Sequence, residues 1–127
     1  MGHTILIVED NEMNRELMRD ILEARGYVVH EASDSAEARR FLTGNSCDLI
    51  LLDVQLPGED GLAVTRNLRE DPKTRTIPII AVTAYAMTGD RERILQAGCD
   101  AYVSKPINTR ELPKIVETFL QGKEESV

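Results

Sequence analysis

With 127 residues, the chain is long enough for one domain with its own hydrophobic core and too short for a second catalytic or DNA-binding domain. Its 22 acidic residues outnumber its 15 basic ones, and the net charge of −7 argues against direct binding to nucleic acid. Cys47 and Cys99 lack the spacing of a metal or redox motif, and no leader or membrane-spanning stretch is visible, so we expect a cytoplasmic protein.

The first half of the chain contains two strand–helix units. Residues 4–8 are apolar and rich in β-branched side chains, as in a parallel strand that is buried on both faces. Apolar residues at helical spacing follow and end at Gly26, a residue type that commonly terminates helices. Residues 27–32 form the second expected strand, and Asp34, with Glu37 three positions later, predicts the start of the second helix.

The second half repeats this alternation. The apolar run 48–53 is the best candidate for the central strand, because both of its faces require burial. A turn-rich segment separates it from a third helix. The remaining elements are, in order, a strand at 78–83, a helix at about 88–97, a strand at 101–104 and a last helix that Asn108 caps. We expect residues 122–127 to fray.

Strict alternation of strands and helices predicts right-handed crossovers. We therefore expect one α/β domain over residues 1–127, with a doubly wound five-stranded parallel sheet and helices on both of its faces. The number and length of the elements fit the flavodoxin-like strand order 2-1-3-4-5. In that order the first and third strands are neighbours, and their carboxyl ends form the switch point where such sheets bind ligands.

Residues with distinctive chemistry stand directly at the ends of four expected strands: Glu9 and Asp10, Asp53, Thr83, and Lys105. Each alone has a structural explanation, such as acids at a helix N-terminus, a threonine in a strand or a lysine in an ion pair. Three carboxylates in one crevice, however, repel one another. A hard divalent cation with oxygen ligands would relieve that repulsion, and Mg²⁺ is the natural choice.

Together these residues describe a phosphoryl-transfer site. Asp53 would attack phosphorus to form an acyl phosphate, while Lys105 and the cation neutralise charge on the phosphoryl oxygens. Thr83 and the N–H of Ala84 would receive one of those oxygens. Pro106 predicts a rigid turn after the lysine, with a peptide bond that can be cis. No general base for rapid hydrolysis is placed by the sequence, so the product should persist.

These residues and their neighbours resemble the receiver domain of bacterial two-component signalling over essentially the whole chain. The matching segments are 5–11, 49–58, 80–84 and 101–106, and the stretches around 83–87 and 97–102 are similar to stand-alone receivers of the DivK type and to receivers of hybrid histidine kinases. The resemblance implies phosphorylation of Asp53. It also implies direct Mg²⁺ binding by Asp10, Asp53 and the backbone carbonyl of Gln55, with Glu9, in place of the more frequent aspartate, acting mostly through water.

The resemblance further implies a switch between two states. When a phosphoryl oxygen draws in the Thr83 hydroxyl, the ring of Tyr102 would turn inward and change the surface of the fourth helix, fifth strand and fifth helix. Gln55 and Tyr85 would tune dephosphorylation. The implied donor is a sensor histidine kinase or a histidine phosphotransfer protein, and a downstream protein would bind the switched face, through which receivers also often dimerise. Without the surrounding motif of residues 101–106, the simpler interpretation of Tyr102 would be a half-buried aromatic residue on an edge strand, with no role in a switch.

Four alternatives to this interpretation differ in how well they fit the sequence. The chain can be a receiver fragment of a hybrid histidine kinase or of a longer regulator, which remains open. A small phosphatase with an aspartate nucleophile is disfavoured, because Gln55 stands where a second acid is needed. An FMN-binding protein is disfavoured because Glu9 and Asp10 would repel its phosphate, and a degenerate docking receiver because the site is complete. We therefore expect no enzyme, only a protein that catalyses its own phosphorylation and slow dephosphorylation.

Overall fold

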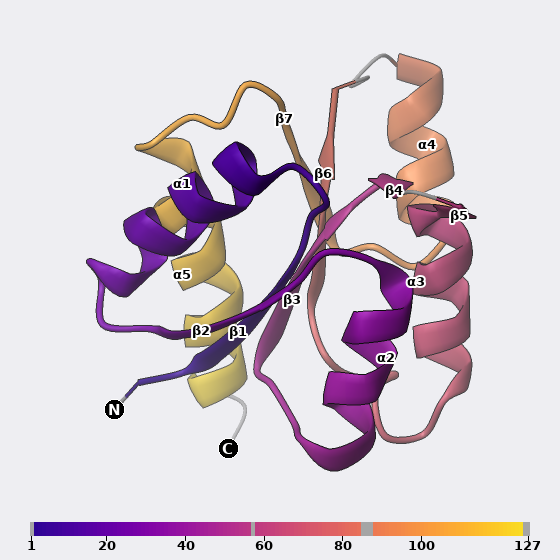
Figure 1. The fold of residues 1–127 in the computed structure, drawn as a ribbon, viewed down its shortest axis with the longest axis horizontal. Coiled ribbons are helices and arrows are strands. Elements are labelled where there is room, and N and C mark those ends of the chain that lie inside the picture. Colours follow the sequence, from indigo (N-terminus) through magenta and orange to yellow (C-terminus); the bar gives the residue numbers. More distant parts are fainter. Residues whose placement is uncertain (1, 57, 85–87, 126–127) are drawn as a thin grey trace.

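A five-stranded parallel sheet lies at the centre of the computed structural model, which describes residues 2–56, 58–84 and 88–125. Its strands are β1 (Thr4–Val8), β2 (Val28–Ala32), β3 (Leu49–Asp53), β6 (Ile79–Thr83) and β7 (Ala101–Ser104). They lie in the order β2-β1-β3-β6-β7, which is the expected order 2-1-3-4-5 when these strands alone are counted (Figure 1). The predicted doubly wound sheet is confirmed.

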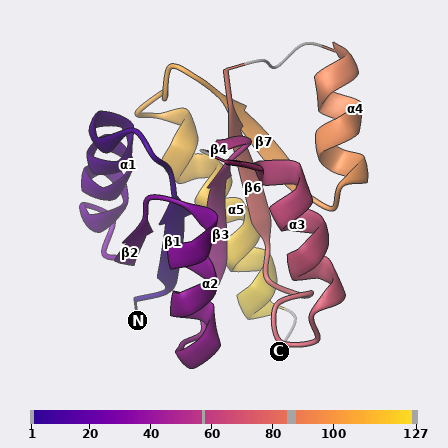
Figure 2. The same cartoon turned by 45° about the vertical axis from the view of Figure 1, so that its right-hand side comes forward.

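The described residues form five helices: α1 (Glu12–Glu23), α2 (Ser35–Gly44), α3 (Gly61–Glu70), α4 (Thr88–Gln96) and α5 (Glu111–Glu125). Helices α1 and α5 cover one face of the sheet, and α2, α3 and α4 cover the other, as expected (Figures 1 and 2). None of these described helices has the length and apolar character that a membrane span requires.

Side chains that alternate along the strands divide the interior into two cores. Ile5 and Ile7 belong to the core beneath α1 and α5, whereas Leu6 and Val8 belong to the core beneath α2, α3 and α4. Every residue of β3 is buried, including the terminal Asp53. Because burial of one large aliphatic side chain contributes about 1.5–3 kcal/mol, a sheet covered on both faces holds its strands in a fixed register.

Polar side chains cap the helices near their first residues. The Asn11 side chain accepts a hydrogen bond from the Asn14 N–H (2.9 Å) at the start of α1. As the sequence predicts, Asp34 caps α2 by accepting from the Glu37 N–H at 2.8 Å. Asn108, the other predicted cap, accepts from the N–H of Glu111, the first residue of α5, at 2.9 Å.

The segment after β3 is more ordered than its turn-rich sequence predicts. Strands β4 (Gln55–Leu56) and β5 (Glu59–Asp60) pair as a small antiparallel hairpin, and α3 begins directly after it at Gly61. A Cβ atom at Gly61 would lie 2.7 Å from the Cα of Val54 and would also meet the carbonyl oxygen of Asp53. Only glycine therefore lets α3 start so close to the backbone that follows Asp53.

One helix end differs from expectation. Helix α1 ends at Glu23, before Gly26, and Gly26 has a φ of 87° in the turn that leads to β2. Helix α5 runs from Glu111 to Glu125, and the fraying expected for residues 122–127 stays a prediction. Residues 126–127 lie outside the described part of the chain.

Candidate functional site

The register of the parallel strands brings the predicted site residues to one edge of the sheet. Val8 of β1 pairs with Leu52 of β3, so Glu9 and Asp53 come next on neighbouring strands. Asp53 pairs with Val82 of β6. Thr83, one residue further on, pairs with Ser104 of β7, and Lys105 follows directly. The predicted convergence of strand-end residues is therefore present in the fold.

Three carboxylates meet at this edge. Glu9, Asp10 and Asp53 each offer one oxygen, and these oxygens all lie within 4.8 Å of one another. Glu9 is fully buried and Asp53 is 1% exposed, whereas Asp10 is open to solvent. The cluster therefore has two carboxylates in the protein interior and one on the side from which a ligand would arrive.

Lys105 lies between the two buried acids. Its Nζ atom donates to Asp53 Oδ2 at 3.0 Å and lies 3.1 Å from Glu9 Oε1. The other oxygen of Asp53, Oδ1, accepts from the N–H of Gln55 at 2.9 Å. Both oxygens of Asp53 are thus held, and its carboxylate has a fixed orientation.

Glu9 is held less completely. Its Oε2 accepts from the N–H of Asn11 at 3.2 Å. Its Oε1, although close to Lys105, has no partner with hydrogen-bond geometry among the residues that the structure describes. A buried carboxylate oxygen without a hydrogen bond is costly, so this atom favours a ligand that can approach it.

Burial and charge change the pKa values of these groups. Burial, reinforced by the nearby carboxylate of Asp53, raises the pKa of Glu9 from 4.5 to about 7. Burial by itself lowers the pKa of Lys105, but its hydrogen bond to Asp53, its ion pair with Glu9 and the charges of both acids outweigh that effect and leave this pKa above its ordinary value. The lysine therefore stays protonated, and its single positive charge does not balance the three carboxylates around it.

The donor set fits a small divalent cation. It consists of carboxylate oxygens only, one of them buried without a hydrogen bond, and hard cations such as Mg²⁺ prefer oxygen ligands. The structure also places Gln55, the expected backbone ligand, beside Asp53 through its N–H. Pro106 follows Lys105 across a cis peptide bond.

The predicted switch residues lie on one face of the sheet. Thr83 is 2% exposed at the end of β6, and Ala84 after it is exposed. Tyr102 pairs with Ala81, two residues before Thr83, so the side chains of Thr83 and Tyr102 point to the same face from neighbouring strands. Tyr85, which we expected to flank the site, lies outside the described residues.

Two arginines that sequence analysis did not single out contact the predicted residues. Arg15 of α1 donates to the backbone carbonyl of Glu9 at 3.0 Å. Arg91 of α4 donates to the hydroxyl of Tyr102 at 2.6 Å. The position of Arg15, five residues after Asp10, could have indicated its contact with the acid pair, whereas Arg91 lies on a weakly amphipathic helix whose rotation the sequence does not define.

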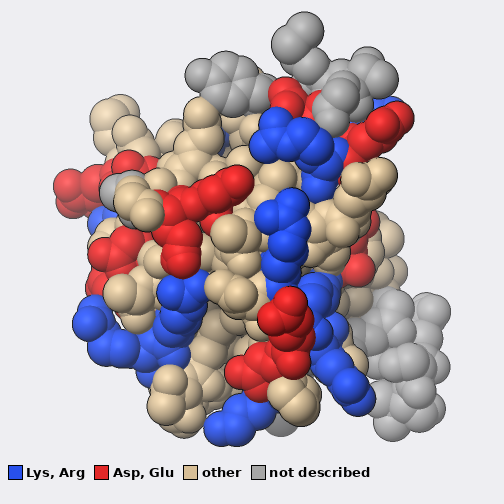
Figure 3. All heavy atoms as spheres, turned by 90° about the vertical axis from the view of Figure 1, so that its right-hand side faces the viewer, with Lys and Arg blue, Asp and Glu red and all other residues tan. Residues whose placement is uncertain are grey.

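A pocket of about 310 Å³ opens beside Thr83, between the β4–β5 hairpin and α4. Its lining includes Gln55, Asp60 and the ion pair of Asp90 with Arg93, whose atoms are 3.1 Å apart. The pocket was not predicted, because it depends on the unforeseen hairpin. On the side of the molecule that carries α3 and α4, basic and acidic side chains are interspersed (Figure 3).

Comparison with known proteins agrees with this geometry. Residues 5–117 match the family model of the response regulator receiver domain. The polar-differentiation response regulator DivK of Brucella anthropi is 49% identical over 119 residues, which are 94% of each chain.

Two solved structures show the same fold. A response regulator from Chloroflexus aurantiacus has a TM-score of 0.91 and 33% identity, covering 95% of this chain and 99% of that one. The receiver domain of a sensor histidine kinase from Pseudomonas aeruginosa has a TM-score of 0.86 and 40% identity, with coverage of 95% and 99%, and holds a magnesium ion in its active-site cleft. The chain belongs to the response regulator receiver domain family of two-component systems.

Proposed function

We propose that this receiver accepts a phosphoryl group on Asp53 from a histidine of a sensor kinase or of a phosphotransfer protein. The observation that carries the proposal is the fixed carboxylate of Asp53, which is bound by Lys105 on one oxygen and by the Gln55 N–H on the other. Two further acids stand beside it with an oxygen each within 4.8 Å. Such a group is oriented for attack and needs no activation by a base, because it is already an anion.

In the transfer step, an Asp53 oxygen forms a bond to phosphorus while the nitrogen–phosphorus bond of the donor breaks. The bonding electrons stay with the donor imidazole, which takes a proton from solvent. Lys105 moves from pairing the carboxylate to neutralising the phosphoryl oxygens, and Thr83 and the N–H of Ala84 bind one of them. These groups stabilise the charge that spreads over the phosphoryl oxygens in the transition state.

Mg²⁺ is the cofactor that the donor set supports. Asp10, Asp53 and the backbone carbonyl of Gln55 would bind it directly, and Glu9 through water. When bound, the ion supplies positive charge for the phosphoryl oxygens and removes the repulsion among the carboxylates. The oxygen of Glu9 that lacks a hydrogen bond supports this assignment.

The phosphorylated state is read by other proteins and is not turned over quickly. The histidines of the chain, His3 and His30, lie before β1 and within β2, away from the carboxyl edge of the sheet, so neither serves as a base for hydrolysis. The chemistry is therefore limited to the protein's own phosphorylation and slow dephosphorylation.

The signal passes from Thr83 to Tyr102 and changes the surface formed by α4, β7 and α5. The shared sheet face of the two residues supports this route. Conversion from a mostly inactive to a mostly active population requires about 5 kcal/mol of differential interaction, which several charge-assisted hydrogen bonds at the phosphoryl group can supply. A downstream protein binds this surface, and a second copy of the receiver can bind it as well.

Mass spectrometry after incubation with acetyl phosphate and Mg²⁺ tests the assignment of Asp53. We expect the wild type to gain one phosphoryl group that hydroxylamine removes, and Asp53→Asn to gain none. Asp20→Asn, which alters an exposed aspartate on α1, is the matched control and should be labelled like the wild type. Equal labelling of the Asp53 variant would contradict the proposal.

A further inference from the structure

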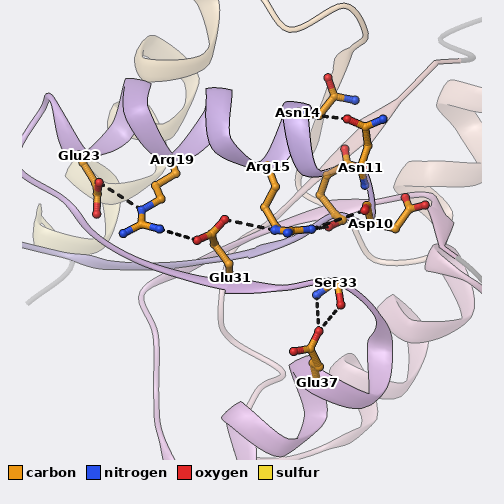
Figure 4. Close-up of polar contacts among 10 residues, drawn as sticks. Asp10, Asn11, Asn14, Arg15, Arg19, Glu23, Glu31, Ser33 and Glu37 are labelled. Carbon is orange, nitrogen blue, oxygen red and sulfur yellow. Dashed lines mark hydrogen bonds and ion pairs between the residues drawn. The ribbon is translucent and has the colours of Figure 1, made fainter.

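Arg15 turns its guanidinium back toward the turn that carries two of the three acids. From the first half of α1, its Nη1 atom donates to the carbonyl oxygen of Glu9 at 3.0 Å and lies 3.5 Å from that of Asp10 (Figure 4). The side chain is only 20% exposed. Arg15 therefore contacts the backbone of both residues and not their carboxylates.

The three acids differ in what orients their side chains. The carboxylates of Glu9 and Asp53 are each fixed by a backbone N–H and by Lys105. The carboxylate of Asp10 receives no hydrogen bond from the residues that the structure describes. The direction in which its Cα–Cβ bond leaves the backbone is set by the peptide planes on either side of Asp10, and these are the planes that Arg15 contacts.

Arg15 is itself held in place from the edge of the sheet. Its Nε lies 3.2 Å from Oε1 of Glu31 on β2, and the other oxygen of Glu31 accepts from Arg19 at 2.7 Å. Arg19 also lies 3.3 Å from Glu23 one turn later (Figure 4). This chain of ion pairs connects the turn after β1 to the neighbouring strand.

Charge alone would give Arg15 the opposite effect. A cation near a metal site repels the metal, and a long flexible arginine without partners would weaken binding for that reason. Here Glu31 neutralises the guanidinium, and the carbonyls of Glu9 and Asp10 fix its position. Preorganisation of the turn is therefore the larger effect, as for other groups that orient metal ligands from behind.

We propose that Arg15 is a positioning residue of the metal site, which holds the Glu9–Asp10 turn so that the Asp10 carboxylate faces Asp53 before any cation binds. The proposal rests on the proposed function, since it takes Mg²⁺ as the ligand of the three acids. Its consequence is that affinity for the cation depends on a side chain that does not touch it.

Calorimetric titration of the metal-free protein with MgCl₂ alone tests this role. We expect Arg15→Met to bind Mg²⁺ about 10-fold more weakly than the wild type, and Arg15→Lys, which keeps one donor, to recover part of the loss. Arg19→Met is the matched control, because it removes ion pairs to Glu31 and Glu23 but no contact with the turn, and it should stay within about 2-fold of the wild type.

A second readout separates positioning from general destabilisation. In EDTA, amide NMR shifts of residues 9–11 should move in Arg15→Met, while those of the distant β6 and β7 strands stay in place. If Arg15→Met does not fold, Glu31→Gln serves instead, because it removes the charge that anchors Arg15 and should weaken Mg²⁺ binding about 3-fold.

The outcomes distinguish the two proposals. Wild-type affinity in a folded Arg15→Met protein, or in Glu31→Gln where that variant is used, overturns the role of Arg15 and leaves the metal site standing. A wild-type protein that does not bind Mg²⁺ overturns the metal site itself.

Discussion

Arg91 holds the hydroxyl of Tyr102: its Nε donates to that oxygen at 2.6 Å, and its guanidinium carbon lies 5.5 Å from the centre of the ring. The contact joins α4 to β7 across the surface that is proposed to change on phosphorylation. It holds the ring by its outer end, at α4. An inward turn of Tyr102 toward Thr83 has to break it.

Replacement of Arg91 by alanine should therefore favour the phosphorylated-like state. A hydrogen bond combined with a cation–π contact at an exposed site contributes about 0.5–1 kcal/mol, which corresponds to a roughly 2- to 5-fold gain in the affinity for beryllofluoride, a mimic of the phosphoryl group. Fluorotyrosine NMR of Tyr102 reports ring position in the same samples. Arg93→Ala, which among the described residues breaks only the ion pair to Asp90 on the same helix, is the control. Unchanged affinity in Arg91→Ala would show that the contact does not restrain the ring.

Glu9 should make the stability of the metal-free protein depend on pH. Its pKa is raised from 4.5 to about 7 in the folded state, so between these pH values the folded state binds more protons than the unfolded state. The contribution is fully present below pH 4.5 and is lost as pH rises through about 7, for a total of roughly 3 kcal/mol. Urea unfolding in EDTA at several pH values measures it. In Glu9→Gln this fall should be absent, and a fall of the same size in that variant would assign it to other groups.

Lys105→Met should destabilise the protein most at alkaline pH. Without the ammonium group, the buried carboxylates of Glu9 and Asp53 lose their shared counter-charge, at a cost of about 2–3 kcal/mol because the lysine is partly exposed. At pH 5, protonation of Glu9 relieves the repulsion, so the loss should be smaller there. Lys114→Met, on the exposed side of α5, controls for the loss of one positive charge. An equal loss at pH 5 and pH 8 would mean that the lysine stabilises by packing.

Gly61→Ala should disturb the site through the backbone. The new Cβ would lie 2.7 Å from the Cα of Val54 and against the carbonyl of Asp53, so either α3 or the end of β3 must shift. We expect a loss of about 2 kcal/mol in the free energy of unfolding and slower labelling by acetyl phosphate. Gly44→Ala, where a Cβ meets nothing within 4 Å, is the matched control and should be neutral. Wild-type labelling in a stable Gly61→Ala protein would contradict this account.

The sheet and the meeting of its strand ends could be predicted, because the apolar runs are continuous and each is followed by a chemically distinct residue. Once the strands are known to be parallel neighbours, their register alone places Asp53 beside Glu9. The capping residues Asp34 and Asn108 could also be predicted from the sequence, because a cap accepts a hydrogen bond from a backbone N–H within three residues of its own position.

Other features depend on distances that the sequence does not encode. Strands of two residues have no detectable period, so the β4–β5 hairpin and the pocket beside it were missed. The partners of Arg15 and Arg91 depend on the rotation of their helices and on long side chains with many rotamers. The pKa of Glu9 depends on burial of a charge, which follows from packing of the whole domain.

The carboxyl ends of the parallel strands lie at one edge of the sheet, and this has an evolutionary consequence. The acids, the lysine and the threonine sit just where the strands stop, at one rim of the sheet, and are not part of the layers beneath the helices. Substitutions on the solvent side of a helix can therefore redirect the protein to new partners while the rim stays intact. The phosphorylation chemistry can therefore be kept during evolution while the binding partners change, all within a single small domain.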